Sequence, residues 1–441
     1  MSVVIFPDLL QKKSRAFLRK SIAFSVLSLT LPTFAVDRTW SGATSNLWTL
    51  DANWAAGVRP GGSDIAVFSG VTSSTDTNGN YGVQGARFTG TGNHTVGGTG
   101  ILALGTSGIE VLGTTQVVTF SKTVRPNKNL TIRNDGTLNF NSPLQLEGSQ
   151  TDSNILYTVT FDGSGNTTVD SLSRRRSNYD MSLIKNGTGT VILSKTSDNQ
   201  EAAYDSSVDA NGSTGYIKGD ITINNGLLLA NNPTGSATGG GNITINASGR
   251  IGGTGSITGG SAKNITLTSG TLLVGATHGA GGSAQDFQLG SSSSFALAGI
   301  TSTNVGIGLH GSLQFDIMGA GSLNALTNTS YNTLANNDLL RLYTTGALSL
   351  DNSTVYLAAA NTTGWAEGQS WKLIDWTNAT GTFSASNLLL GTTTIGGWNL
   401  TGTANSTGYF VTASAVPEPS RALLFAAGMM GLLFVRKRRA M

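Results

Sequence analysis

A short alternating pattern of apolar and polar residues recurs at equal intervals in the middle of the chain. It begins at Ile221, Ile243 and Ile265, which are 22 residues apart, and each isoleucine is followed by threonine and a second branched apolar residue. Alternation with a period of two is typical of a β-strand with one buried face. Such strands also occur in β-sandwiches, but three equal spacings favour successive coils of a parallel β-solenoid.

If each repeat is one coil, equivalent residues of successive coils lie next to one another. We expect Ile221 and Ile223 to face the interior and Thr222 to face outward. Ile221, Ile243 and Ile265 should then form one apolar column. Asparagine and threonine side chains beside the turns should form similar columns at the surface.

Glycine follows each copy of the pattern, at Gly226, Gly249 and Gly270. Glycine adopts positive φ without a steric penalty, so we expect these residues at the corners between strands. Composition agrees, because glycine supplies 59 of the 441 residues. The chain has no cysteine, which excludes a disulfide scaffold, cysteine-ligated zinc and thiol catalysis.

The pattern is less regular on both sides of the repeat. Trp40, Trp48 and Trp54 lie near the start, and we interpret them as a cap over the first coil, whose open edge would otherwise pair with other chains. A second interpretation is that these rings stack on a carbohydrate. Between residues 291 and 415 the alternation persists without the 22-residue spacing, which predicts either irregular last coils or a small terminal β-domain.

The formal net charge of +3 is concentrated at the two ends of the chain. Removing residues 1–35 and 421–441 leaves 17 basic and 23 acidic residues, a net charge of −6. This central part has no basic stripe suited to a phosphate backbone, so we expect no nucleic-acid partner.

Residues 1–35 have the pattern of a secretory signal peptide. Basic residues precede a short apolar run, Pro32 interrupts it, and small residues lead to Ala35. We predict cleavage after Ala35 and export through the inner membrane; an ordinary amphipathic helix is the alternative.

Three features follow one another at the C-terminus, namely a proline motif, an apolar run at 422–435 and a basic cluster. The motif consists of Val416, Pro417, Glu418 and Pro419. The cluster consists of Arg436, Lys437, Arg438 and Arg439. The apolar run is short for a membrane span, but flanking basic side chains can reach the interfaces, and the cluster would keep that end cytoplasmic.

This order of features resembles the PEP-CTERM sorting signal of Gram-negative bacteria over residues 416–441. The resemblance implies recognition by an exosortase, a transient anchor in the inner membrane, and cutting near the proline motif. It further implies delivery to the cell surface or extracellular matrix, often together with exopolysaccharide or a biofilm. A simple C-terminal membrane anchor is the alternative.

Residues 182–274 resemble the autotransporter-associated β-strand repeat, with an extra polar loop from Ser194 to Thr214. We therefore expect an all-β fold in which a right-handed parallel β-helix with its tryptophan cap covers residues 36–290. A β-rich part covers 291–415, and the sorting signal with its transmembrane helix covers 416–441.

Few residues suggest chemistry. The three histidines are isolated, and we predict no catalytic residues, no metal and no cofactor. The run Arg174, Arg175 and Arg176 is either a solvated loop or a contact with an acidic glycan. The sequence thus predicts a structural or adhesion-type surface protein that contacts exopolysaccharide or other surface proteins. The alternative is a β-helical polysaccharide lyase or glycoside hydrolase, although the acidic residues show no spacing that defines a catalytic pair.

Overall fold

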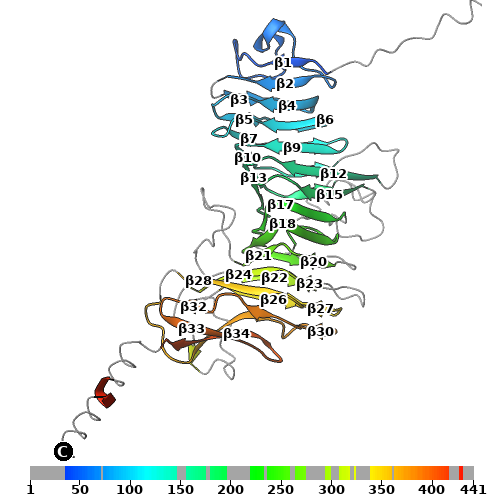
Figure 1. Cartoon of the computed structure of the whole chain (residues 1–441). Coiled ribbons are helices and arrows are strands. Elements are labelled where there is room, and N and C mark those ends of the chain that lie inside the picture. Colours follow the sequence, from blue (N-terminus) through cyan, green and yellow to red (C-terminus); the bar gives the residue numbers. More distant parts are fainter. Residues whose placement is uncertain are drawn as a thin grey trace, which may run out of the picture. The chain divides into compact units, whose positions relative to one another are not determined.

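Parallel β-strands make up most of the regular structure in the computed structural model (Figure 1). The chain divides into two units, Met1–Val36 and Asp37–Met441. The structure describes residues 35–70, 73–146, 155–174, 179–195, 219–232, 236–258, 264–274, 294–298, 307–317, 322–323, 338–359, 362–416 and 427–430.

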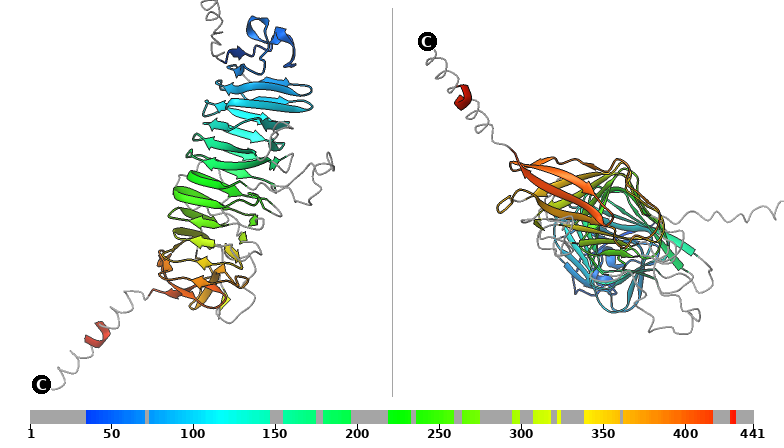
Figure 2. Two further views of the ribbon diagram at one scale, coloured as in Figure 1. Left: turned by 90° about the vertical axis from the view of Figure 1, so that its right-hand side faces the viewer. Right: turned by 90° about the horizontal axis from the view of Figure 1, so that it is seen from below.

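Within the second unit, most strands pair in parallel with strands one coil earlier and one coil later (Figure 2). We call the resulting rows of paired strands ladders. The first ladder contains β1 (Asp37–Thr39), β2 (Ile65–Phe68), β4 (Tyr81–Phe88), β6 (Ile101–Val111), β9 (Leu130–Asn134), β12 (Ile155–Asp162), β15 (Tyr179–Lys185), β17 (Ile221–Ala230), β18 (Ile243–Gly253), β20 (Ile265–Leu267), β23 (Ile307–Leu309), β27 (Leu348–Ser349) and β30 (Phe383–Ser384).

The second ladder shares the long strands β17 and β18 with the first. Its other members are β3 (Ser73–Asp76), β5 (His94–Gly97), β7 (Val117–Phe120), β10 (Thr137–Phe140), β13 (Asn166–Val169), β16 (Thr190–Leu193), β21 (Thr271–Val274), β24 (Ser312–Ile317), β28 (Thr354–Ala359) and β31 (Leu389–Leu390). This arrangement of strand neighbours is consistent with a β-solenoid.

A third set of strands completes the coils. In the N-terminal half, the first residues of β4 and β6 pair with each other and begin a third row of parallel strands. The row continues with β8 (Thr123–Pro126), β11 (Leu144–Leu146) and β14 (Leu172–Arg174). Further along, a separate sheet begins with the parallel strands β19 (Ser256–Thr258), β22 (Ser294–Ala298), β26 (Leu339–Tyr343) and β29 (Gln369–Asp375). Two short 3-10 helices, η1 (Asp51–Asn53) and η2 (Ala55–Gly57), lie between β1 and β2.

The separate sheet ends in antiparallel strands. These are β25 (Ser322–Leu323), β34 (Gly408–Ala415), β33 (Trp398–Ala404) and β32 (Thr394–Ile395). Meanwhile the first and second ladders continue past residue 290 to β30 and β31. The 291–415 part thus combines further parallel coils with the antiparallel end of the separate sheet.

The predicted register of the 22-residue repeat is confirmed. Ile221 pairs with Ile243, and Ile243 pairs with Ile265. All three side chains are buried, whereas Thr222 is only half-buried. The column extends in both directions beyond the repeat that the spacing identified. Its further members are Leu130, Val159, Leu183, Ile307 and Leu348.

The corner glycines are needed for a different reason from the one predicted. Gly226 has a φ of 71°, but Gly249 and Gly270 do not have positive φ. A Cβ atom on Gly270 would instead lie 2.5 Å from the carbonyl oxygen of Gly249, one coil earlier. The same overlap would occur between Gly165 and the carbonyl oxygen of Gly136. Close stacking of the turns, more than an unusual backbone angle, therefore requires glycine at most of these corners.

Asparagine side chains form the expected columns beside the turns. The Asn224 side-chain amide donates to Asn186 Oδ1 at 2.8 Å, and Asn246 donates to Asn224 Oδ1 at 2.7 Å. Just before β18 and β20 begin, the backbone N–H of Asn264 donates to Asn242 Oδ1 at 2.9 Å. These bonds link successive coils and satisfy polar groups that the turns leave outside the ladders.

Lys185 and Lys122 are buried inside the stack. Lys185 occupies an inward position of the first ladder, and its ammonium group donates to the carbonyl oxygens of Gly187 and Asn225. Lys122 donates to Thr77 Oγ1 and to two turn carbonyl oxygens. Burial lowers the pKa of each lysine to about 8, although Asp162 and Asp76 act in the opposite direction.

Because the pKa values of these lysines are lowered, we expect the folded state to become more stable as pH rises from 8 to 10. In the unfolded chain a lysine keeps its ordinary pKa near 10.5, so over this interval the unfolded state binds more protons than the folded state. Urea unfolding should show that the free energy of unfolding rises by about 1–3 kcal/mol over this pH interval because of Lys185. The Lys185→Met variant should lose this part of the rise, and variant Lys128→Met, at an exposed site, should keep it. A stability that is flat or falls between pH 8 and 10 would contradict this assignment.

The sorting features at the two ends lie largely outside the described residues. Ala35 is described and lies two residues before β1, whereas residues 1–34 are not described. Val416 is exposed, and Pro417, Glu418, Pro419 and the basic cluster at 436–439 lie outside the described residues. A helical turn is present at 427–430. Within the ranges given above, no helix is both long enough and apolar enough to cross a membrane.

Candidate ligand-binding groove

The three N-terminal tryptophans form an aromatic cluster at the first coils. The rings of Trp48 and Trp54 lie 5.2 Å apart between centroids, and Trp48 contacts Phe68 at 5.5 Å. Phe68 stacks on Phe88 at 4.8 Å, so the cluster continues into the aromatic core of the coils. This packing is what a cap requires.

The same packing covers both faces of two of these rings, so a sugar cannot stack on them. Trp48 is 0% exposed and Trp54 is 2% exposed. A carbohydrate stacks on an open ring face, so the structure does not offer Trp48 or Trp54 as a glycan contact. Trp40 is half-buried and lies 5.0 Å from Trp54.

The predicted arginine contact falls at the edge of the described chain. Arg174 is the last residue of β14, and nothing is described of its side chain; Arg175 and Arg176 lie outside the described residues.

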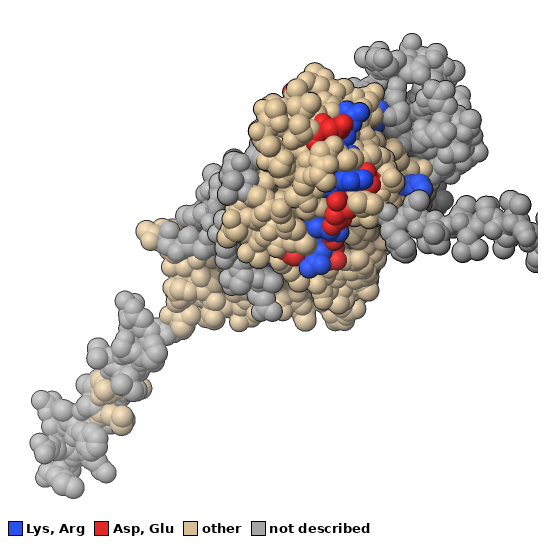
Figure 3. Space-filling model, turned by 90° about the horizontal axis from the view of Figure 1, so that it is seen from above, with Lys and Arg blue, Asp and Glu red and all other residues tan. Residues whose placement is uncertain are grey.

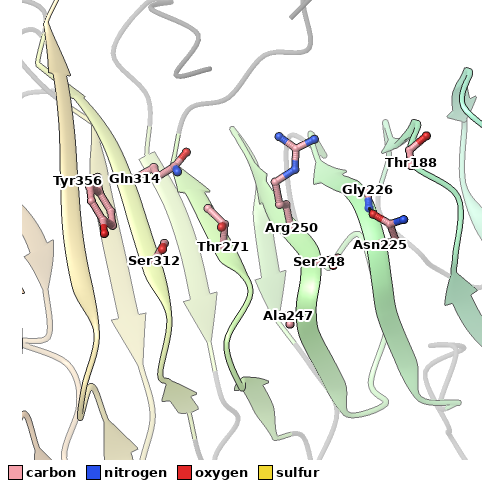
Figure 4. Close-up of a pocket in the computed structure, with 10 residues that line it drawn as sticks. All are labelled: Thr188, Asn225, Gly226, Ala247, Ser248, Arg250, Thr271, Ser312, Gln314 and Tyr356. Carbon is pink, nitrogen blue, oxygen red and sulfur yellow. Dashed lines mark hydrogen bonds between the residues drawn. The ribbon is translucent and has the colours of Figure 1, made fainter. Parts of the chain in front are cut away.

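A groove of about 600 Å³ lies along the outer face of the second ladder (Figure 4). Its size is within the range typical of small-ligand sites. Six consecutive coils contribute to it, through strands β17, β18, β21, β24 and β28 and the turn before β16. Its described lining consists of Thr188, Asn225, Gly226, Ala247, Ser248, Arg250, Thr271, Ser312, Gln314 and Tyr356.

Strand register brings these residues together. Arg250 of β18 pairs with Thr271 of β21, and Thr271 pairs with Ser312 of β24. Two residues further along the strand, and therefore on the same face, Gln314 pairs with Tyr356 of β28. The outward positions of the second ladder thus bring polar side chains from several strands to one face, beside a small apolar cluster of Leu227, Leu229 and Leu273.

Arg250 is the one charged residue in the described lining of this groove. Its side chain projects from β18 with Thr271 and Gln314 on one side and Asn225 and Thr188 on the other (Figure 4). No hydrogen bond or ion pair joins its guanidinium group to another described residue. Burial lowers the pKa of Arg250 from its ordinary value. The groove therefore contains a partly desolvated positive charge that has no acidic partner among the described residues.

Other arginines of the first coils are paired with carboxylates. Arg87 contacts Glu110 at 2.5 Å and Asp37 at 2.7 Å, and the hydrogen bond to Glu110 raises the pKa of Arg87. Arg133 contacts Asp135 at 3.3 Å. Seen from above, basic and acidic side chains of the described surface alternate in one line (Figure 3). Arg250 differs from these residues because no described acidic residue compensates its charge.

Among residues with a described placement, no group of three or more histidine, aspartate or glutamate side chains could hold a metal ion. The polar lining of the groove is suited to hydrogen bonding and to attraction of an anion. Sequence inspection missed this site because Arg250 is an isolated arginine in a glycine-rich stretch. Its outward position could have been read from the alternation in β18, but its neighbours come from strands far apart in the chain.

Comparison with known proteins does not assign a ligand to this groove. No family model matches the chain, and no curated protein matches it.

Proposed function

We propose that the protein is an exported structural or adhesion-type component of a Gram-negative cell surface or extracellular matrix. In this proposal the stacked coils form a right-handed parallel β-helix. Residues 1–35 are removed as a signal peptide, and the segment 416–441 anchors the chain in the inner membrane until an exosortase processes it. Exopolysaccharide or other surface proteins are the proposed partners.

The observation that carries the proposal is the length and regularity of the parallel ladders. The first ladder runs from Asp37–Thr39 to Phe383–Ser384 with parallel pairing at each step. Each coil contacts its neighbours, so stability accumulates along the stack without disulfides, which suits a chain with no cysteine. The outward positions repeat from coil to coil, and repeated polar positions suit weak multivalent contact with a polymer or a neighbouring cell.

Replacement of the two motif prolines tests the sorting step. With Pro417→Ala and Pro419→Ala, we expect unprocessed chain to accumulate in the inner-membrane fraction of the native host, because the stiff, donor-free segment presented to the processing enzyme is lost. Cell fractionation with immunoblotting measures both location and size. The neighbouring Ser420→Ala change is the matched control and should leave processing intact.

Two results would contradict the proposed function. The first is unchanged location and size of the double proline variant. The second is depolymerisation of an acidic polysaccharide by the purified full chain, which would replace this proposal by the lyase or glycoside hydrolase alternative.

A further inference from the structure

We propose that the Arg250 groove binds a carboxylate-bearing polysaccharide chain that lies across successive coils, along the direction of stacking. This inference deepens the proposed function and relies on it only to place the protein within reach of such a polymer. The site itself is argued from the groove's charge, lining and geometry.

The charge of the groove favours an anion. Arg250 has no acidic partner among the described residues, and it interacts unfavourably with the buried Lys185, whose pKa it lowers further. Lys185 lies directly behind the groove, because it donates to the carbonyl oxygen of Asn225 in the groove lining. A carboxylate beside Arg250 would be attracted by both positive charges, and the planar guanidinium group can bind it through two parallel hydrogen bonds.

The rest of the lining favours a polyhydroxylated ligand. Thr188, Ser248, Thr271 and Ser312 offer hydroxyl groups that donate and accept. The amides of Asn225 and Gln314 add further donors and acceptors, as the hydroxyl groups of a sugar require.

Tyr356 supplies an aromatic surface at one end of the groove. This residue is 37% exposed, in contrast to the buried Trp48 and Trp54. An amphipathic ring with an accessible surface can contact the apolar face of a sugar while its hydroxyl group remains hydrated.

The geometry favours a polymer over a small anion. Six coils line the groove, so it extends for roughly 24 Å at about 4.8 Å per coil. A ligand that fills this length meets hydroxyl or amide groups at most steps and a positive charge at one. Nucleic acid carries a phosphate at each nucleotide and would need several cations, whereas the described lining has one. A sugar chain with many hydroxyl groups and widely spaced carboxylates better matches a lining of many neutral polar groups and one positive charge.

Binding of fluorescently labelled hyaluronan oligosaccharides, which carry one carboxylate per disaccharide, to the full chain tests the inference. Fluorescence anisotropy should show saturable binding that weakens with added salt. Fully methyl-esterified oligosaccharides of the same length, which keep the hydroxyl groups and lose the charge, should bind about ten-fold or more weakly. The Arg250→Gln variant should lose affinity for the acidic probe by a similar factor.

Two controls separate this site from general charge attraction and from misfolding. Arg133→Gln removes an exposed arginine of an earlier coil, outside the groove, and should leave the affinity unchanged. Arg250→Lys keeps the charge without the bidentate fork and should retain part of the binding; circular dichroism confirms the fold of each variant. The inference is overturned if neither probe binds, if both probes bind equally, or if folded Arg250→Gln binds like the parent chain. None of these results depends on export, so they leave the sorting proposal to its own test.

Discussion

Ile243→Asp should cost on the order of 4 kcal/mol or more of the free energy of unfolding. Ile243 is fully buried and lies between Ile221 and Ile265 in the central apolar column. An aspartate at this position would place a carboxylate in the core between two apolar neighbours. Because coils are stabilised by contacts with adjacent coils, the change should also weaken the coupling between the two halves of the stack.

Urea unfolding followed by far-ultraviolet circular dichroism measures this effect. The matched control is Thr244→Asp, one residue along the same strand on the outward face, which should change the free energy of unfolding by about 1 kcal/mol or less. Ile243→Val keeps the apolar character and should cost about 1 kcal/mol. Equal effects of aspartate at positions 243 and 244 would contradict the assigned inward and outward faces.

The equal spacing of three isoleucines was sufficient to predict the register of the central coils. Equivalent residues of a regular stack must lie one repeat apart, and the column Ile221–Ile243–Ile265 follows directly. The column continues to Ile307 and Leu348, but unequal insertions between the strands hide this continuity in the sequence. For this reason the 291–415 part could not be divided into coils beforehand.

Other features depend on packing between coils, which a linear pattern does not contain. Gly249 and Gly270 were predicted as corners, but the carbonyl oxygen that excludes a side chain belongs to the preceding coil. Lys185 falls at an inward position of an alternating strand, so its burial was readable from the pattern. Its acceptors, the carbonyl oxygens of Gly187 and Asn225, come from the turn before β16 and from β17, which the fold brings together.

The candidate groove could not be predicted for the same reason. Arg250, Gln314 and Tyr356 are far apart in the sequence, and strand pairing across four coils brings them to one face. The run that begins at Arg174 and the cap tryptophans were predicted as glycan contacts because these residues are clustered in the sequence. Trp48 and Trp54 are close in the sequence, and the structure shows that they pack against one another in the core.

Engineered disulfides test the central claim, which is that successive 22-residue repeats stack in parallel and in register. The chain has no cysteine, so introduced pairs have no competing thiols. Thr222 pairs with Thr244, and Thr244 pairs with Thr266, all on the half-buried outward face. Paired strands lie about 4.8 Å apart. A disulfide needs Cα atoms within roughly 4.4–6.8 Å of each other, so adjacent pairs fit.

The measurement compares three double variants after mild oxidation, by gel mobility and mass spectrometry of the intramolecular cross-link. Thr222→Cys with Thr244→Cys, and Thr244→Cys with Thr266→Cys, should cross-link nearly completely. Thr222→Cys with Thr266→Cys, two coils apart at roughly 9.6 Å, should remain reduced. Failure of both adjacent pairs, or cross-linking of the distant pair as readily as the adjacent ones, would contradict the stacked register.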